Sequence, residues 1–129
     1  REIALARPSN TGTGTTREQL VAAIVRTVES IRAHPLFVKI LRSDPDLLLT
    51  YIVERLGTSQ RAILDHLVPT IEAGQADGSI RSGDPTAIAT MVLLTAQSVV
   101  QSSGMVAEIV TPDRLVAELA TALDAYLAG

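Results

Sequence analysis

Apolar residues recur at three- and four-residue spacings through most of the chain, which is the period of an amphipathic helix. Four segments show this spacing clearly: residues 17–33, 45–56, 59–76 and 112–127. A shorter apolar group at residues 36–41 fits one or two further helical turns. No stretch alternates apolar and polar residues over the length of a strand. The pattern therefore predicts an all-α fold.

Cap residues mark where several of these helices begin. Asp44-Pro45, Asp84-Pro85 and Thr111-Pro112 each place a capping side chain before a proline, whose missing N–H costs no hydrogen bond in the first helical turn. Thr16 is the predicted cap of the first helix, with Gln19 reaching back to it. The sequence thus predicts helix starts with more precision than periodicity alone allows.

Glycine and proline mark the predicted interruptions and ends. Gly57 is expected to end the 45–56 helix, and Ser59 to cap the helix that follows. Pro69 is expected to kink that second helix, because its ring removes one backbone hydrogen bond. Asp77-Gly78 is the predicted stop.

The predicted helix over residues 85–103 is apolar on nearly every side, and a small domain has too little interior to cover it all. We therefore expect its surplus face to pack on a second copy of the chain, together with the last helix. This predicts a homodimer joined by a four-helix bundle, two helices from each copy. The interface residues expected from this reasoning are Ala89, Leu93, Ala96, Val100, Val116, Leu119, Ala120, Leu123 and Leu127.

Composition and charge narrow the class of protein. The chain has 129 residues, 47% of them apolar, a formal net charge of -3 and no cysteine. This length and composition suit one domain with an apolar core and no disulfides. The basic residues are scattered singly along the chain, so they predict no positively charged surface that would bind nucleic acid. Two histidines, His34 and His66, stand far apart in the sequence, so no metal site is predicted. No cofactor is predicted either.

The sequence contains no segment typical of a membrane span or an export signal. Residues 86–107 carry no charge, but polar side chains interrupt them too often for a hydrocarbon environment. The N-terminus has no charged segment followed by an apolar one, as an export signal would have. We expect a cytoplasmic protein, and the start at Arg1 suggests a piece of something longer.

A ligand site would need an apolar cavity with a few polar groups aimed into it. The candidates are polar or adaptable side chains in apolar surroundings: Tyr51, His66, Met91, Thr95 and Gln97. Met91 also suits ordinary core filling, and His66 also suits a hydrogen-bonded or half-exposed histidine. Gln97 also suits a hydrogen bond across the dimer bundle. With few aromatic residues in the chain, the walls should be aliphatic, which favours aliphatic or mixed apolar ligands.

Enzyme signatures are missing from the sequence. There is no Gly-x-Ser-x-Gly elbow and no Walker loop, and the paired acids Asp44 and Asp46 suit a helix N-terminus, where anions are favoured. The Gly/Thr-rich segment at residues 11–15 has no lysine and no preceding strand, so a loop explains it better than a phosphate site. We do not expect catalysis.

The order of the motifs resembles the C-terminal regulatory domain of a TetR-family transcriptional regulator. The resemblance rests on HPLF at residues 34–37, Asp44-Pro45, IEAGQADGSIR at residues 71–81, and Gly83-Asp84-Pro85. It implies a helical bundle that binds a small, often hydrophobic effector between its helices and dimerises through its last two helices. It also implies an N-terminal helix-turn-helix domain that binds operator DNA.

That DNA-binding half is not expected within this chain, because nothing before Leu20 suits a three-helix reading head. Residues 1–15 are predicted as the tail of a linking helix and a flexible loop, and residues 16–129 as the effector-binding and dimerisation domain. Two hypotheses follow. The chain is the sensing domain of a TetR-like repressor, or it is a stand-alone dimeric helical module that binds an apolar ligand without DNA.

Overall fold

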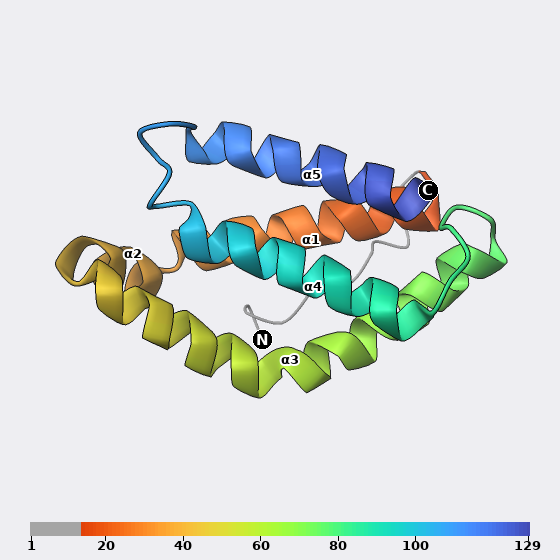
Figure 1. The fold of residues 1–129 in the computed structure, drawn as a ribbon, viewed down its shortest axis with the longest axis horizontal. Helices are drawn as coiled ribbons and strands as arrows, with labels where there is room; N and C mark the ends of the chain where they lie inside the picture. The colour runs from red at the N-terminus through yellow and green to blue at the C-terminus, as the bar shows by residue number, and fades with distance from the viewer. Residues whose placement is uncertain (1–13) are drawn as a thin grey trace.

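Residues 14–129 form five helices and no strand in the computed structural model, which describes this range apart from the side chains of residues 41, 45 and 48–59. The helices are α1 (Thr16–Ala33), α2 (Pro35–Ser43), α3 (Pro45–Ala76), α4 (Pro85–Ser102) and α5 (Pro112–Ala128), as Figure 1 shows. The predicted all-α class is confirmed. The predicted linker tail falls almost entirely in residues 1–13, outside the described residues.

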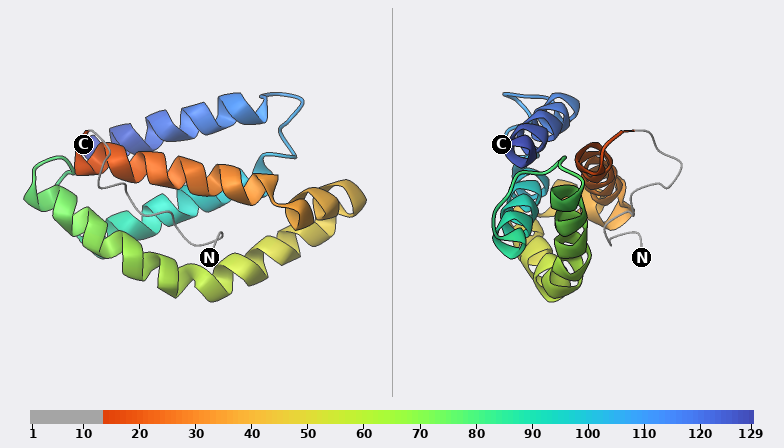
Figure 2. Two further views of the ribbon diagram at one scale, coloured as in Figure 1. Left: turned by 180° about the vertical axis from the view of Figure 1, so that it is seen from behind. Right: turned by 90° about the vertical axis from the view of Figure 1, so that its right-hand side faces the viewer.

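Helix α1 is the centre of the bundle and contacts each of the other four helices. Helix α5 packs along one side of α1, and α4 lies across the bundle from α1, with the long, curved α3 packed against both (Figures 1 and 2). Short α2 turns the chain from the end of α1 into α3. Helix α4 therefore packs against three other helices: α1, α3 and α5.

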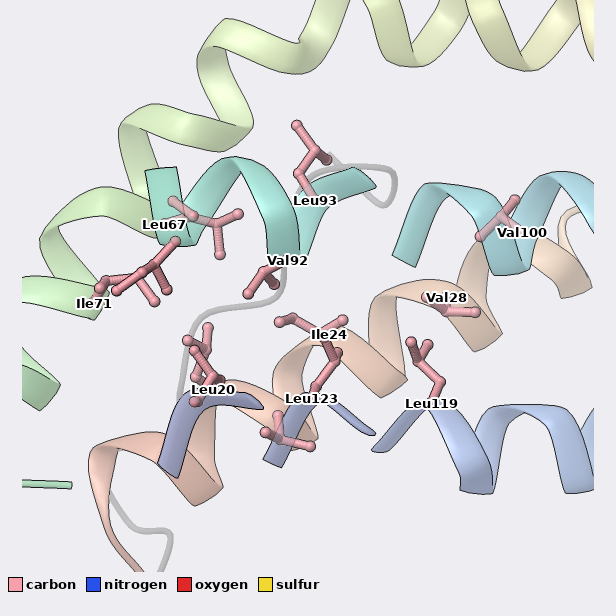
Figure 3. Packing of buried hydrophobic residues seen from close by; sticks show 14 of the residues in the cluster. Leu20, Ile24, Val28, Leu67, Ile71, Val92, Leu93, Val100, Leu119 and Leu123 are labelled. Atoms are coloured by element: carbon pink, nitrogen blue, oxygen red, sulfur yellow. The ribbon is translucent and has the colours of Figure 1, made fainter. Parts of the chain in front are cut away.

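One continuous apolar core runs through the bundle. Its members are aliphatic except for Phe37, and Figure 3 shows how leucine, isoleucine and valine side chains from four helices meet. Leu20 and Ile71 have no exposed surface at all. The fully buried large side chains are Leu20, Leu67, Ile71, Leu123, Leu127, Val28, Val92 and Val100.

The proline-marked helix starts are confirmed. Asp44 accepts a hydrogen bond from Leu47 N at 3.2 Å, Asp84 from Thr86 N at 3.1 Å, and Thr111 from Arg114 N at 3.3 Å. His34 adds a fourth, because its Nδ1 accepts from Leu36 N at 3.2 Å and so caps α2. These caps satisfy backbone donors that have no partner inside the helix.

The cap of α1 lies one residue earlier than predicted. Thr15, rather than Thr16, accepts from Glu18 N at 3.1 Å, while the Glu18 carboxylate accepts from Thr15 N at 2.9 Å. This reciprocal capping box satisfies two backbone donors at once. Adjacent threonines made both registers available in the sequence, and the glutamate at the third helical position selects the earlier one.

The break predicted at Gly57 is wrong, because α3 runs through it as one helix of 32 residues. A glycine costs a helix only about 1 kcal/mol relative to alanine, which packing on both sides can offset. The apolar positions also stay in phase: Leu56 and Ile63 are seven residues apart, which is two turns. Pro69 lies inside the helix as predicted.

The turn from α3 into α4 packs tightly against the helix it follows. Asp77 ends α3, and Gly78 adopts a φ of +86°, a conformation that favours glycine. Ile80 N then donates to Gly74 O at 3.0 Å, which brings the Ile80 side chain across Gly74. A Cβ at Gly74 would lie 2.3 Å from Ile80 Cδ1, so glycine is required there by close approach.

An ion pair, hydrogen bonds and a cation–π contact join the start of α1, the α3–α4 turn and the end of α5. Arg17 pairs with Asp124 at 2.9 Å and donates to Ser79 O at 2.7 Å. Arg81 N donates to Leu127 O at 2.8 Å, and the Arg81 guanidinium lies 4.7 Å from the centre of the Tyr126 ring. These interactions hold three segments together at one end of the bundle.

The pKa of the Asp77 carboxyl is lowered because the Thr16 hydroxyl donates a hydrogen bond to it, as do the Ser79 hydroxyl and backbone N–H. A lowered folded-state pKa stabilises the fold above the unfolded pKa, near pH 4, and this stability is lost as the pH falls through the folded-state value. Asp77→Asn should therefore show a shallower fall in urea midpoint than the native chain between about pH 5 and pH 3. Parallel pH profiles for the two proteins would contradict this.

Candidate functional site

An apolar cavity lies between α1, α3 and α4. The cavity is open to solvent on one side, and its walls enclose only a small part of the space between the helices. Figure 3 shows Ile24 and Val28 of α1, Leu67 of α3 and Val92 of α4 extending into this part of the interior. The lining residues are Ile24, Thr27, Val28, Ile31, Ile63, Leu67, Val92, Leu93, Ala96, Gln97 and Val100.

Helical spacing on three elements produces this lining. Residues 24, 27, 28 and 31 share one face of α1, and residues 93, 96, 97 and 100 share one face of α4. Ile63 and Leu67 come from one face of α3, just before Pro69. Each helix therefore contributes a stripe of short aliphatic side chains, and the cavity is the space that the three stripes leave unfilled.

The described side chains that line the cavity are aliphatic except for Thr27 and Gln97. The Thr27 hydroxyl donates to Ala23 O at 2.9 Å, within its own helix. Gln97 Oε1 accepts from Gln60 Nε2 at 3.4 Å, a long hydrogen bond that links α4 to α3. No charged or aromatic side chain is among the described residues of the lining. Such walls accommodate apolar ligands.

Of the predicted ligand residues, Gln97 lines the cavity. His66 is exposed on α3, and Met91 is 51% exposed on α4. Thr95 is half-buried, and its hydroxyl donates to Met91 O at 2.7 Å. Neither His66, Met91 nor Thr95 lines the cavity, because the inward positions of α3 and α4 lie one or two residues away along each helix. The side chain of Tyr51 lies outside the described residues.

Sequence reasoning missed the α1 wall of the cavity, which is formed by Ile24, Thr27, Val28 and Ile31. Three of them, Ile24, Val28 and Ile31, have the helical spacing of any inward-facing apolar residues, because an aliphatic side chain that packs tightly and one that borders a void recur at the same positions. No signal in a single sequence separates the two cases. The expectation of aliphatic walls does agree with the lining that is present.

Most of the residues expected at a dimer interface are buried inside one chain. Seven of the nine are 8% exposed or less, because α1 and α3 cover α4 and α1 covers α5; they are Ala89, Leu93, Val100, Val116, Leu119, Leu123 and Leu127. Ala96 and Ala120 are half-buried. A side chain already removed from water has little surface left for a second copy. The seven buried positions therefore belong to the core of the single chain, and the dimer itself stays a prediction.

Apolar surface does remain elsewhere on the last two helices and the segment between them. Met91 and Leu94 are 51% and 49% exposed on α4. Met105 and Ile109, between α4 and α5, are 76% and 81% exposed. The outer side of α5 carries small exposed residues, among them Ala117, Ala122 and Ala125.

Among the residues in the described part of the chain, no group of three or more histidine, cysteine, aspartate or glutamate side chains is arranged to hold a metal ion. Likewise, none of the helices in this part of the chain is long and apolar enough to cross a membrane.

Comparison with known proteins finds clear relatives. The chain is 42% identical over 114 residues to proteins from two strains of Mycobacterium tuberculosis and from Mycobacterium bovis. Each is described as an uncharacterized HTH-type transcriptional regulator. The matched region covers 88% of this chain but only 59% of each relative. No family model matches the chain, and no solved structure matches it.

Proposed function

We propose that this chain is the effector-sensing and dimerisation domain of a TetR-like transcriptional repressor whose DNA binding responds to a small apolar ligand. The observation that carries this proposal is the 42% identity to proteins described as HTH-type transcriptional regulators. The motif order described for residues 34–85 supports the assignment to a TetR-like regulatory domain. Such a regulator acts on DNA in the cytoplasm and needs no catalysis.

The coverage of the match supports a DNA-binding domain outside the region that this chain represents. The relatives extend well beyond the matched 59% of their length, which leaves room for a helix-turn-helix domain outside the region that this chain represents. The chain itself has a net charge of -3, which does not suit a DNA-binding surface. In the full-length protein, we therefore expect the part outside this region to contact DNA and this domain to contact the ligand.

The cavity supports the sensing role because it joins three helices. A ligand among Ile24, Leu67 and Val92 would contact α1, α3 and α4 together. An effector shifts a conformational equilibrium only by its difference in affinity for the two states. The walls of this cavity belong to separate helices, so its size changes when the helices move relative to one another. The affinity for a ligand then differs between the two arrangements of the helices.

The dimer is proposed through the remaining outer surface of α4 and α5, not through the residues first expected there. Met91 and Leu94 offer exposed apolar surface on α4, and alanines on α5 permit close helix approach. Light scattering at tens of micromolar should give about twice the monomer mass of 13.7 kDa. A mass of one chain under these conditions would contradict the dimer.

The regulatory role is tested with the full-length protein and DNA fragments that it selects from its own genome. Octanol, used as a probe of the aliphatic walls, should weaken DNA binding by at least about fivefold in fluorescence anisotropy. Ala96→Phe fills the cavity and should abolish this response while DNA binding persists. Ala87→Phe, on the exposed side of the same helix, is the matched control and should respond as the native protein does.

Two results would contradict the proposal. One is a full-length protein that selects no DNA sequence. The other is DNA binding that stays constant while octanol demonstrably occupies the cavity. In the second case the chain would be the apolar-ligand module without control of DNA.

A further inference from the structure

The walls of the cavity discriminate against charge. Its described lining presents aliphatic carbon from α1, α3 and α4, and none of these residues is a lysine, arginine, aspartate or glutamate. A carboxylate or ammonium group moved from water into such a site loses its hydration without gaining a partner of opposite charge. A ligand that enters fully must therefore be uncharged.

One hydrogen-bonding position lies in the wall. Gln97 is the lining residue with a carboxamide, and its Oε1 accepts from Gln60 Nε2 at 3.4 Å. Typical N–H···O bonds are about 0.4–0.5 Å shorter, so this link is easily exchanged for a better one. A carboxamide both donates and accepts, so it can pair with a hydroxyl, a carbonyl or an amide of a ligand.

Arg32 is the nearest alternative anchor for a charged ligand. It follows the lining residue Ile31 on α1, and its Nε is buried with no hydrogen-bond partner among the described residues. However, Arg32 does not line the cavity and is only half-buried. It therefore provides a competing outcome for the test and not the expected contact.

We infer that the cavity between α1, α3 and α4 binds an uncharged aliphatic molecule with one hydrogen-bonding group, which replaces Gln60 as the partner of the Gln97 carboxamide. This rests on the proposed function only in taking the cavity as the sensor site. The aliphatic part of the ligand fills the space between Ile24, Leu67 and Val92. Its polar group then separates Gln60 from Gln97, which loosens the contact between α3 and α4.

The test compares three molecules with the same chain length and different head groups. Calorimetric titration of the 129-residue chain should detect octanol binding, with octanoate and octylammonium at least about tenfold weaker. Ala96→Phe should abolish octanol binding, and Ala87→Phe should leave it unchanged, which places the molecule in the cavity. Thermal shift of each variant against its own ligand-free form separates lost binding from lost folding.

Gln97→Glu tests the hydrogen-bonding position directly. A carboxylate in the wall should reverse the preference, so that octylammonium binds at least about tenfold more tightly than octanol. Gln101→Glu, one turn further along α4 and outside the lining, is the matched control and should keep the native order.

Three outcomes would overturn the inference. Octanoate binding tighter than octanol, with the preference lost in Arg32→Gln, would assign the head group to Arg32. An unchanged order of affinities in Gln97→Glu would remove Gln97 from the site. Absence of binding by all three molecules would exclude an aliphatic ligand of this size. None of these results decides whether the full-length protein regulates DNA, because that role is read from DNA binding alone.

Discussion

Leu20→Ala is expected to lower the free energy of unfolding by about 3 to 5 kcal/mol. Leu20 is fully buried on the central helix α1. It belongs to the same buried cluster as Leu123 of α5 and Ile71 of α3, all three of which are labelled in Figure 3. Removing its side chain loses apolar burial and leaves a cavity that helices from several directions cannot all close at once. A loss of this size is a large part of the 5 to 15 kcal/mol typical of a folded domain.

Urea denaturation monitored by circular dichroism measures this loss. Leu47→Ala is the matched control, because the same atoms are removed from a leucine that is 51% exposed. The control should change the free energy of unfolding by less than about 1 kcal/mol. Equal losses for the two variants would mean that α1 is not the centre of the core.

Gly74→Val is expected to destabilise the chain by about 1 to 3 kcal/mol, although valine normally suits a helix better than glycine does. The physical reason is the turn that folds back over α3. A Cβ at Gly74 would lie 2.3 Å from Ile80 Cδ1 and 3.0 Å from Ile80 Cβ. Ile80 is 4% exposed and cannot move outward without leaving the core. The added side chain therefore displaces the whole α3–α4 turn.

A double-mutant cycle identifies Ile80 as the cause. Ile80→Ala alone should be destabilising because it leaves a cavity, but it also makes room for the valine. The double variant Gly74→Val/Ile80→Ala should thus be more stable, by about 0.5 to 3 kcal/mol, than the sum of the single losses implies. Ala73→Val controls for valine on the exposed side of α3. Strict additivity of the two losses would show that the close approach of residues 74 and 80 is not the source of strain.

Helix boundaries in this protein were predictable because they depend on local chemistry. An aspartate or threonine before a proline supplies the capping oxygen and tolerates the missing N–H, whatever surrounds the helix. The starts of α3, α4 and α5 at Pro45, Pro85 and Pro112 follow from this rule. Gly57 shows where local chemistry is not enough. The low helix propensity of one glycine did not end α3, a helix of 32 residues, because the apolar face continues in phase on both sides of it.

The candidate site was predictable only in its general chemistry. Scarcity of aromatic residues implied aliphatic walls, and the lining is aliphatic apart from Thr27 and Gln97. Gln97 was among the candidates because a carboxamide in an uncharged helix is conspicuous. The α1 wall was not foreseen, since Ile24 and Val28 have the spacing of any core-facing residues.

Periodicity identifies which side of a helix is apolar, but it does not identify what covers that side. The order of amino acids was enough for the all-α class, most helix ends and the aliphatic character of any cavity. Packing assigned Leu93, Val100 and Leu123 to the core of a single chain, and left Met91 and Leu94 on its surface. That assignment depends on where α1 and α3 lie in space, and contacts between distant segments are not encoded in the spacing along any one helix.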